Sequence, residues 1–267
     1  KKLPAPSYAA PQLNDKPGWY RIAPHVHTVH SDGRLTPAEV IALGKASGLD
    51  GIVSTDHNTT SALLHWGEVQ DPEFLVINGV EVTYGQGHWN IFGLDPHAWI
   101  DFRIHHNDTL RYRKAVAKAR KAGRLLVANH PYNLDFLYDV TPMDGIEVWN
   151  SAWSPANERA VELWHTLLVG GNRKFAVAST DFHRGGNIAS PHTVVRAEAL
   201  SAEAVIDAIA AGRSYVARDA SVEIGMQVRN SATPVQHADI GDTLLRSGGM
   251  QAEFQSNTAG RLRMTDQ

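Results

Sequence analysis

The chain has 267 residues and a formal net charge of −3 at pH 7, so we expect no basic surface for nucleic acid or an anionic membrane. It contains no cysteine, which excludes disulfides and thiolate metal sites and leaves nitrogen and oxygen atoms as metal ligands. No apolar run approaches the roughly 20 residues that a membrane-spanning helix needs. This length suits either one α/β barrel or two smaller domains.

Residues 1–18 are rich in Pro and Ala, a composition that is typical of an extended segment, and we expect an N-terminal lead without helix or strand. The sequence leaves two locations open. The protein is either exported, periplasmic or secreted, after removal of a leader, or it is cytoplasmic.

From Trp19 onward, short apolar runs alternate with helical stretches. The predicted strands are 19–26, 51–54, 74–82, 125–128, 145–148 and 175–178, and the predicted helices are 38–47, 108–122, 157–168 and 201–211. The first helix has a capping box of Thr36 and Glu39, with Pro37 at its first position. This alternation predicts an α/β protein with a mostly parallel sheet, open or closed into a barrel.

The sequence changes character near its end. Short β-like runs at 222–228 and 251–255 are separated by Gly, Asn and Ser. We therefore predict a barrel over 19–215 and a small β-rich C-terminal appendage over 216–267.

Polar clusters follow six of the predicted strands: HVH, TDHN, GVEVT, NHP, EVWN and STDFH. In a barrel of parallel strands, the carboxyl ends of the strands form the face on which active sites are built. Scattered surface histidines would have no reason to follow this register, so we predict a functional site at this face.

His25 and His27 stand at positions i and i+2 of a strand, so both side chains point to one face and can bind one ion. Each could equally be a buried histidine that bonds a backbone carbonyl. Asp32 could be a turn residue before Gly33. His57 is the expected ligand of TDHN, and Asp56 would orient a liganding imidazole or accept a backbone donor.

Three further strand ends carry potential ligands: Glu81, His130, and the pair Asp181 and His183. A carboxylate in an apolar strand needs a partner, which a metal or a salt bridge would supply. Each residue alone has an ordinary explanation. Five strand ends that all carry histidine, aspartate or glutamate together predict a metal site.

These segments resemble the PHP (polymerase and histidinol phosphatase) family of metal-dependent hydrolases, through H-V-H-T-x-x-S-D-G, S-T-D-H-N, G-V-E-V-T, N-H-P and S-T-D-F-H. The resemblance runs from about Trp19 to Tyr215. The segments GHWNIFG and LSAEAVIDAIAAGRSYVAR are most similar to the CehA/McbA branch, which is named for carbamate-hydrolysing members.

The resemblance implies a distorted TIM-like (β/α)7 barrel that holds two or three divalent metal ions: zinc, manganese or iron. Carried over to this chain, the first ion would be held by His25, His27, Glu81 and Asp181, the second by Glu81 and His130, and the third by Asp32, His57 and His183. Many family members have another histidine ligand where this chain has Asn90. We expect His88, two residues earlier on the same strand face, to replace it.

The implied function is a metal-dependent hydrolase, with a phosphoesterase as the preferred activity. A hydroxide bridging two ions would attack a phosphate ester of a small molecule. We assign Asp181, Glu81, His183 and Arg184 to catalysis, and Arg184, His30 and His192 to the substrate. The alternative for Arg184 is an ordinary surface arginine, and for His30 and His192 solvent-exposed loop histidines.

Two other functions stay open, and so does the oligomeric state. A carbamate or carboxylic ester hydrolase of the CehA/McbA type would want aromatic walls, for which the candidates are Trp89, Tyr132, Trp149, Trp153 and Phe182, unless these pack in the core. A non-catalytic metal-binding domain would lack ligands, whereas nearly the full set is present. An ordinary amidohydrolase also begins with H-x-H, but it fits the SDG, TDHN and D-F-H segments less well.

Overall fold

A computed structural model of the chain describes residues 8–85, 87–105, 107–132, 139–232, 234–245 and 248–261. Its strands are β1 (Gly18–Val26), β2 (Gly51–Ser54), β3 (Leu75–Tyr84), β4 (Gly87–Phe92), β5 (Leu125–Ala128), β6 (Gly145–Asn150), β7 (Phe175–Ser179), β8 (His192–Ala197), β9 (Ser214–Ala217), β10 (Ile224–Asn230), β11 (His237–Asp239) and β12 (Met250–Ser256). Its helices are α1 (Pro37–Ala46), α2 (Leu63–Trp66), α3 (Thr109–Ala122), α4 (Pro155–Val169) and α5 (Ala202–Ala210). None of these helices is long and apolar enough to cross a membrane.

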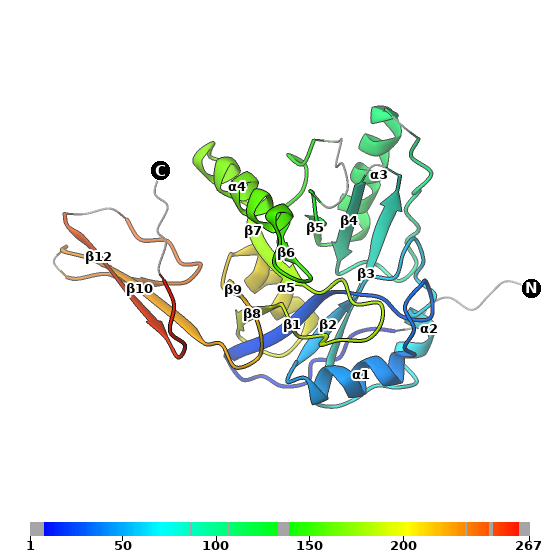
Figure 1. Cartoon of the computed structure of the whole chain (residues 1–267), viewed down its shortest axis with the longest axis horizontal. Coiled ribbons are helices and arrows are strands. Elements are labelled where there is room, and N and C mark those ends of the chain that lie inside the picture. The colour runs from blue at the N-terminus through cyan, green and yellow to red at the C-terminus, as the bar shows by residue number, and fades with distance from the viewer. Residues whose placement is uncertain are drawn as a thin grey trace, which may run out of the picture.

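Nine strands form one sheet in the order β7-β6-β5-β4-β3-β2-β1-β8-β9, which curls into a nearly closed barrel (Figure 1). Strands β1, β2 and β3 are parallel, as are β5, β6 and β7, and β4 is antiparallel to both of its neighbours. The six strands predicted to end in polar clusters therefore run in the same direction. The prediction of a distorted TIM-like α/β barrel is confirmed, and β4 and β8 are its reversed strands.

Strand β1 closes the barrel along the edge that does not pair with β2, and this edge bonds to two partners in turn. Its first half pairs antiparallel with β8, from Gly18 to Ile22. At its far end, the amide of His27 donates to the carbonyl of Phe182 at 2.8 Å, just after β7. The Ser179 hydroxyl also donates to the His25 carbonyl at 3.0 Å. The seam thus closes beside the HVH segment.

The barrel is packed at the end opposite the polar clusters. One buried cluster contains side chains from β1 to β5 and from β7 and β8, among them Ile22 and Val127. Ile206 and Ile209 of α5 pack in the same cluster. Helix α5 therefore covers the amino-terminal ends of the parallel strands. Helix α1 has the predicted capping box, since Thr36 and Glu39 bond reciprocally, and it begins one residue earlier than predicted.

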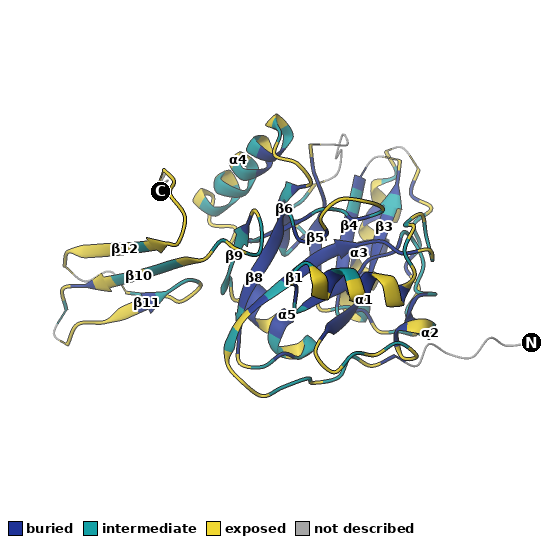
Figure 2. Ribbon diagram, turned by 60° about the horizontal axis from the view of Figure 1, so that its bottom comes forward, coloured by how far each residue is buried: buried dark blue, intermediate teal, exposed yellow. Residues whose placement is uncertain are grey.

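The first and the last described segments of the chain are arranged differently around the barrel. The Tyr8 hydroxyl donates to the Val76 carbonyl at 2.9 Å, so the described part of the lead packs on the barrel without forming a helix or strand. Strand β9 extends the barrel sheet to Ala217. Beyond it, β11, β10 and β12 form a separate three-stranded sheet that projects from the barrel (Figures 1 and 2).

Candidate metal centre

The strand ends bring imidazoles and carboxylates together at one end of the barrel. His25 and His27 at the end of β1 are almost fully buried, as is Glu81 of β3. Asp181 and His183 follow β7 and are partly buried. Asp181 has a φ of 53°, a left-handed conformation that turns the chain sharply after the strand.

The first group of potential ligands surrounds the HVH segment. Nε2 of His25 lies 3.3 Å from Glu81 Oε1 and 3.2 Å from Asp181 Oδ1. Nε2 of His27 lies 3.5 Å from Glu81 Oε2 and 3.0 Å from the same Asp181 oxygen. Two ligand atoms bound about 2 Å from one tetrahedral ion lie about 3.3 Å apart. These separations therefore fit four residues that share an ion.

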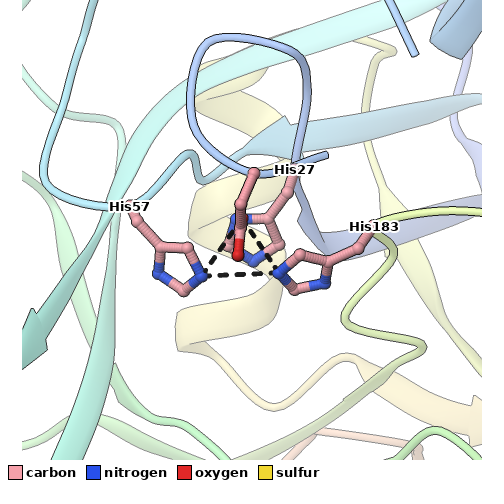
Figure 3. Close-up of side chains that lie close together, drawn as sticks. His27, His57 and His183 are labelled. Atoms are coloured by element: carbon pink, nitrogen blue, oxygen red, sulfur yellow. Dashed lines mark hydrogen bonds and ion pairs between the residues drawn. The ribbon is translucent and has the colours of Figure 1, made fainter. Parts of the chain in front are cut away.

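Nearer the surface lies a group that we call the third group, which consists of Asp32, His57 and His183. Asp32 Oδ1 lies 3.5 Å from His57 Nε2 and 3.2 Å from His183 Nε2, and the two ring nitrogens are 3.4 Å apart. Figure 3 shows the rings of His57 and His183 turned toward each other, with His27 beside them. All three separations match the spacing of ligands around one ion.

Glu81 also belongs to the second group, with His88 and His130. Its Oε1 lies 3.2 Å from His88 Nδ1 and 3.5 Å from His130 Nε2. The amide of Asn90, two residues along β4, points instead to the Pro24 carbonyl, 3.5 Å away. The structure thus brings His88, rather than Asn90, next to the shared carboxylate.

Several atoms in these groups are buried without a hydrogen bond to any described residue. They are His25 Nε2, His27 Nε2, Glu81 Oε2 and Asp181 Oδ1. A buried polar atom left unpaired costs free energy, and native proteins rarely tolerate it without a reason. The four atoms converge on one point and are the nitrogen and oxygen ligands that divalent ions accept. The site therefore fits a metal ion.

The charges of the site shift the pKa values of its members. Burial alone would lower the pKa of His25, but nearby carboxylates, first among them Asp181, raise it well above its ordinary value. For His57 and His130, burial is likewise outweighed by the nearby carboxylate of Glu81, and both pKa values are raised. Burial would raise the pKa of Glu81, but the His25 charge lowers it well below its usual range.

The likeness of this chain to known proteins lies in its fold. No protein-family model and no curated protein matches the chain. A two-domain protein from Bacteroides vulgatus ATCC 8482, described as containing a predicted PHP-like metal-dependent phosphoesterase, is similar with a TM-score of 0.60 and 17% identity, over 91% of this chain and 88% of that one. The chain has the PHP-like fold. PsfC from Pseudomonas syringae PB-5123 is also similar, with a TM-score of 0.54 and 14% identity, over 76% of this chain and 93% of that one.

Within the PHP-like fold, Asp56 holds the loop that carries Asp32. Its two oxygens accept from the Thr28 amide and hydroxyl, both at 2.8 Å, and from the Ser31 hydroxyl at 2.7 Å. The sequence left two roles open for Asp56, and the structure shows the second one, in which Asp56 accepts a hydrogen bond from a backbone amide. Gly33 packs so tightly that a Cβ would lie 2.6 Å from the His27 carbonyl, so the loop needs glycine there.

Three buried residues beside the centre were not recognised from the sequence. Asn129 donates to Glu81 Oε1 at 2.8 Å. Glu147 of β6 lies 3.0 Å from His25 Nδ1, and Asn150 donates to it at 3.1 Å. A carboxylate inside the buried strand GIEVWN was the signal that could have identified Glu147, because such a group needs a partner.

The residues assigned to the substrate lie around and outside the centre. Arg184 directly follows His183 and is exposed. The Nδ1 of His30 lies 2.9 Å from the Ser61 hydroxyl, and its ring contacts His65 rather than a ligand. His192 is fully buried on β8, so it is not a solvent-exposed loop histidine. It shares the outer face of β8 with Val194 and Arg196 because alternate residues of a strand share a face, and this face points away from the centre.

The aromatic candidates divide into two classes. Trp89 and Phe182 are buried and pack in the core. Tyr132 and Trp153 are 39% and 52% exposed, in loops that follow β5 and β6. Trp149 packs edge-on against Trp153 with ring centroids 5.0 Å apart. Of the five candidates, Tyr132, Trp149 and Trp153 are therefore the ones left as walls for a substrate.

Proposed function

We propose that this protein is a metal-dependent hydrolase of the PHP type that cleaves a phosphate ester of a small molecule. The observation that carries the proposal is the convergence of three ligand groups on one buried carboxylate, Glu81. Its oxygens lie 3.5 Å or less from five histidine rings, which come from three strand ends and from β4. A purely structural core would gain nothing from gathering so many polar atoms.

The residues of each group would hold one ion: His25, His27, Glu81 and Asp181 the first, Glu81, His88 and His130 the second, and Asp32, His57 and His183 the third. Divalent ions bound there would lower the pKa of water and neutralise charge on phosphoryl oxygens. Zinc, manganese and iron all accept these ligand types.

The difference in exposure gives the direction from which a substrate would approach. The first group is buried, whereas the Asp32 side chain is 60% exposed and that of His183 is partly open. A phosphate would therefore arrive over the third group. Arg184 follows His183 and is exposed, and we assign its guanidinium to a non-bridging phosphate oxygen.

Cleavage of a carbamate or carboxylic ester, as in the CehA/McbA branch, is the second candidate. The exposed rings of Tyr132 and Trp153 near the carboxyl ends of the strands favour it, because an aryl group would stack on them. The same ligands can serve either reaction, so substrate tests must separate the two.

The test combines metal analysis with activity on one preparation. Bound metals are quantified per chain, and hydrolysis of p-nitrophenyl phosphate, bis-p-nitrophenyl phosphate and a naphthyl carbamate is measured with and without chelator. We expect two or three ions and chelator-sensitive phosphoester hydrolysis. Carbamate hydrolysis alone would support the second candidate. Failure to bind metal even after reconstitution would overturn the proposal.

A further inference from the structure

Glu147 lies behind the metal centre on β6, and the proposed function gives it no role. The residue is 2% exposed, and its two oxygens have separate partners. Oε1 lies 3.0 Å from Nδ1 of His25. Oε2 accepts from the backbone amide of His130 at 2.9 Å and from the Asn150 side chain at 3.1 Å.

These bonds turn both oxygens of Glu147 toward protein groups, and Glu147 belongs to none of the ligand groups. Its contact with His25 is made at the ring nitrogen opposite the one that faces Glu81 and Asp181. An imidazole that donates its Nδ1 proton to a carboxylate presents the lone pair of Nε2, and its ring orientation is fixed. Glu147 thus turns the ligand atom of His25 into the site.

The same carboxylate holds a second ligand through the backbone. His130 has a φ of 26°, in the left-handed region that non-glycine residues rarely adopt, and such a conformation persists only when its surroundings hold it. The bond from the His130 amide to Glu147 is one such restraint. The rings of His25 and His130 are stacked, with centroids 5.7 Å apart and planes 17° apart.

We propose that Glu147 is a positioning residue for His25 and His130, and that it sets the affinity of the ions which these two histidines hold. The inference rests on the proposed function, since it assumes metal ions at the centre. It further states that Glu147 acts on the first and second ions and leaves the third, held by Asp32, His57 and His183, unaffected. No contact links Glu147 to any member of that third group among the described residues.

Glu147→Gln is the direct test, because it preserves size and removes the charge. The carboxylate accepts from three donors, whereas a glutamine side chain presents an NH2 group to at least one of them. Substitutions behind a metal ligand typically weaken metal binding about 10- to 100-fold. We expect a loss of that size for the ions of His25 and His130, with no change for the third ion.

Asp56→Asn is the matched control. Asp56 is also a buried carboxylate with three donors, but it holds the loop of Asp32, so its loss should weaken the third ion and spare the others. Metal-free protein is titrated with zinc against a chromogenic chelator. The variants His25→Ala and His183→Ala assign each binding step, and circular dichroism melts confirm folding.

The outcomes separate the two proposals. If the two variants lose affinity for opposite sets of ions, the positioning role is supported. If Glu147→Gln binds all ions equally more weakly, or binds none more weakly, the positioning role is overturned and the proposed function still stands. If the wild-type protein binds no zinc, both the proposed function and the positioning role fail. Should Glu147→Gln not fold, Asn150→Ala keeps the carboxylate and removes one of its donors. This variant should also bind the first and second ions more weakly and the third unchanged, with a smaller loss of affinity. An equal loss of affinity for all ions would overturn the positioning role.

Discussion

The backbone bond between His27 and Phe182 joins the first strand of the barrel to the segment that follows the last one of the parallel set, with the amide and carbonyl 2.8 Å apart. Phe182 is buried in the core cluster around α1. Its neighbours Asp181 and His183 instead contact His27: Asp181 Oδ1 lies 3.0 Å from His27 Nε2, and the His183 ring stacks on that of His27 with centroids 4.0 Å apart. This closure bond thus brings together ligands from the first and the last strand of the parallel set.

Asp181→Asn should abolish most of the activity. Asp181 Oδ1 lies within 3.2 Å of both His25 and His27, and an amide cannot provide the negative charge that balances an ion there. We expect hydrolysis to fall more than about 100-fold, beyond the usual cost of substitutions behind a ligand, together with loss of one ion per chain. Metal analysis and steady-state kinetics check this. Unchanged metal content would remove Asp181 from the ligands.

His88→Ala and Asn90→Ala form a matched pair on the same face of β4. His88 lies 3.2 Å from Glu81, whereas Asn90 bonds toward Pro24. We expect only His88→Ala to weaken the second ion, by about 10-fold or more. Zinc titration of both variants decides the matter, and the reverse result would make Asn90 the ligand.

The metal-free protein should lose stability as the pH rises above 6.5. The carboxylates around His25, His57 and His130 raise their pKa values above the ordinary 6.5, against the effect of burial. A group whose pKa is raised on folding stabilises the fold below its unfolded value, and this contribution disappears as the pH rises through the folded value.

The same cluster should also lose stability in acid. Glu81 has a pKa lowered below the ordinary 4.5 by His25, so its contribution is present above that value and is lost as the pH falls. Calorimetry of chelated protein should give the highest Tm between these limits, and added metal should raise the Tm most at alkaline pH. A Tm gain from metal that does not depend on pH would contradict this account.

Gly33→Ala should displace the loop that carries Asp32. An added Cβ would lie 2.6 Å from the carbonyl of His27 and 2.7 Å from the amide of Thr28, and backbone atoms cannot move aside as a side chain can. We expect weaker binding of the third ion. Gly85→Ala is the control, since its Cβ would meet no atom within 4 Å. Equal affinity in the two variants would show that the loop tolerates the shift.

The sequence was sufficient to predict the parallel strands and the polar residues at their ends, because period, capping and strand-end position are local properties. The direction of β4 is not local, since alternation alone cannot say which way a strand runs. Strand β8 was missed, and His192 with it was taken for a loop or substrate residue. Its place depends on pairing with β1, which lies far away in the chain.

Glu147 escaped prediction for a related reason. Its partners, His25 and the His130 amide, come from two other strands, and only the closed barrel brings them within reach. Asp56 was singled out but its role stayed open, because the Thr28 hydroxyl and amide that decide it lie across the sheet on the β1 side. Local patterns identify ligands more readily than the groups that orient them.

Glu81 lies between the ligand groups, with Oε1 toward His25, His88 and His130 and Oε2 toward His27 and His57. A carboxylate is rigid and planar, so an ion that draws one oxygen also sets the angle of the other. Occupancy of the first position therefore changes the free energy of filling the second, which shares this carboxylate, and by linkage the effect is mutual. The binding isotherm of these two ions should depart from that of independent sites.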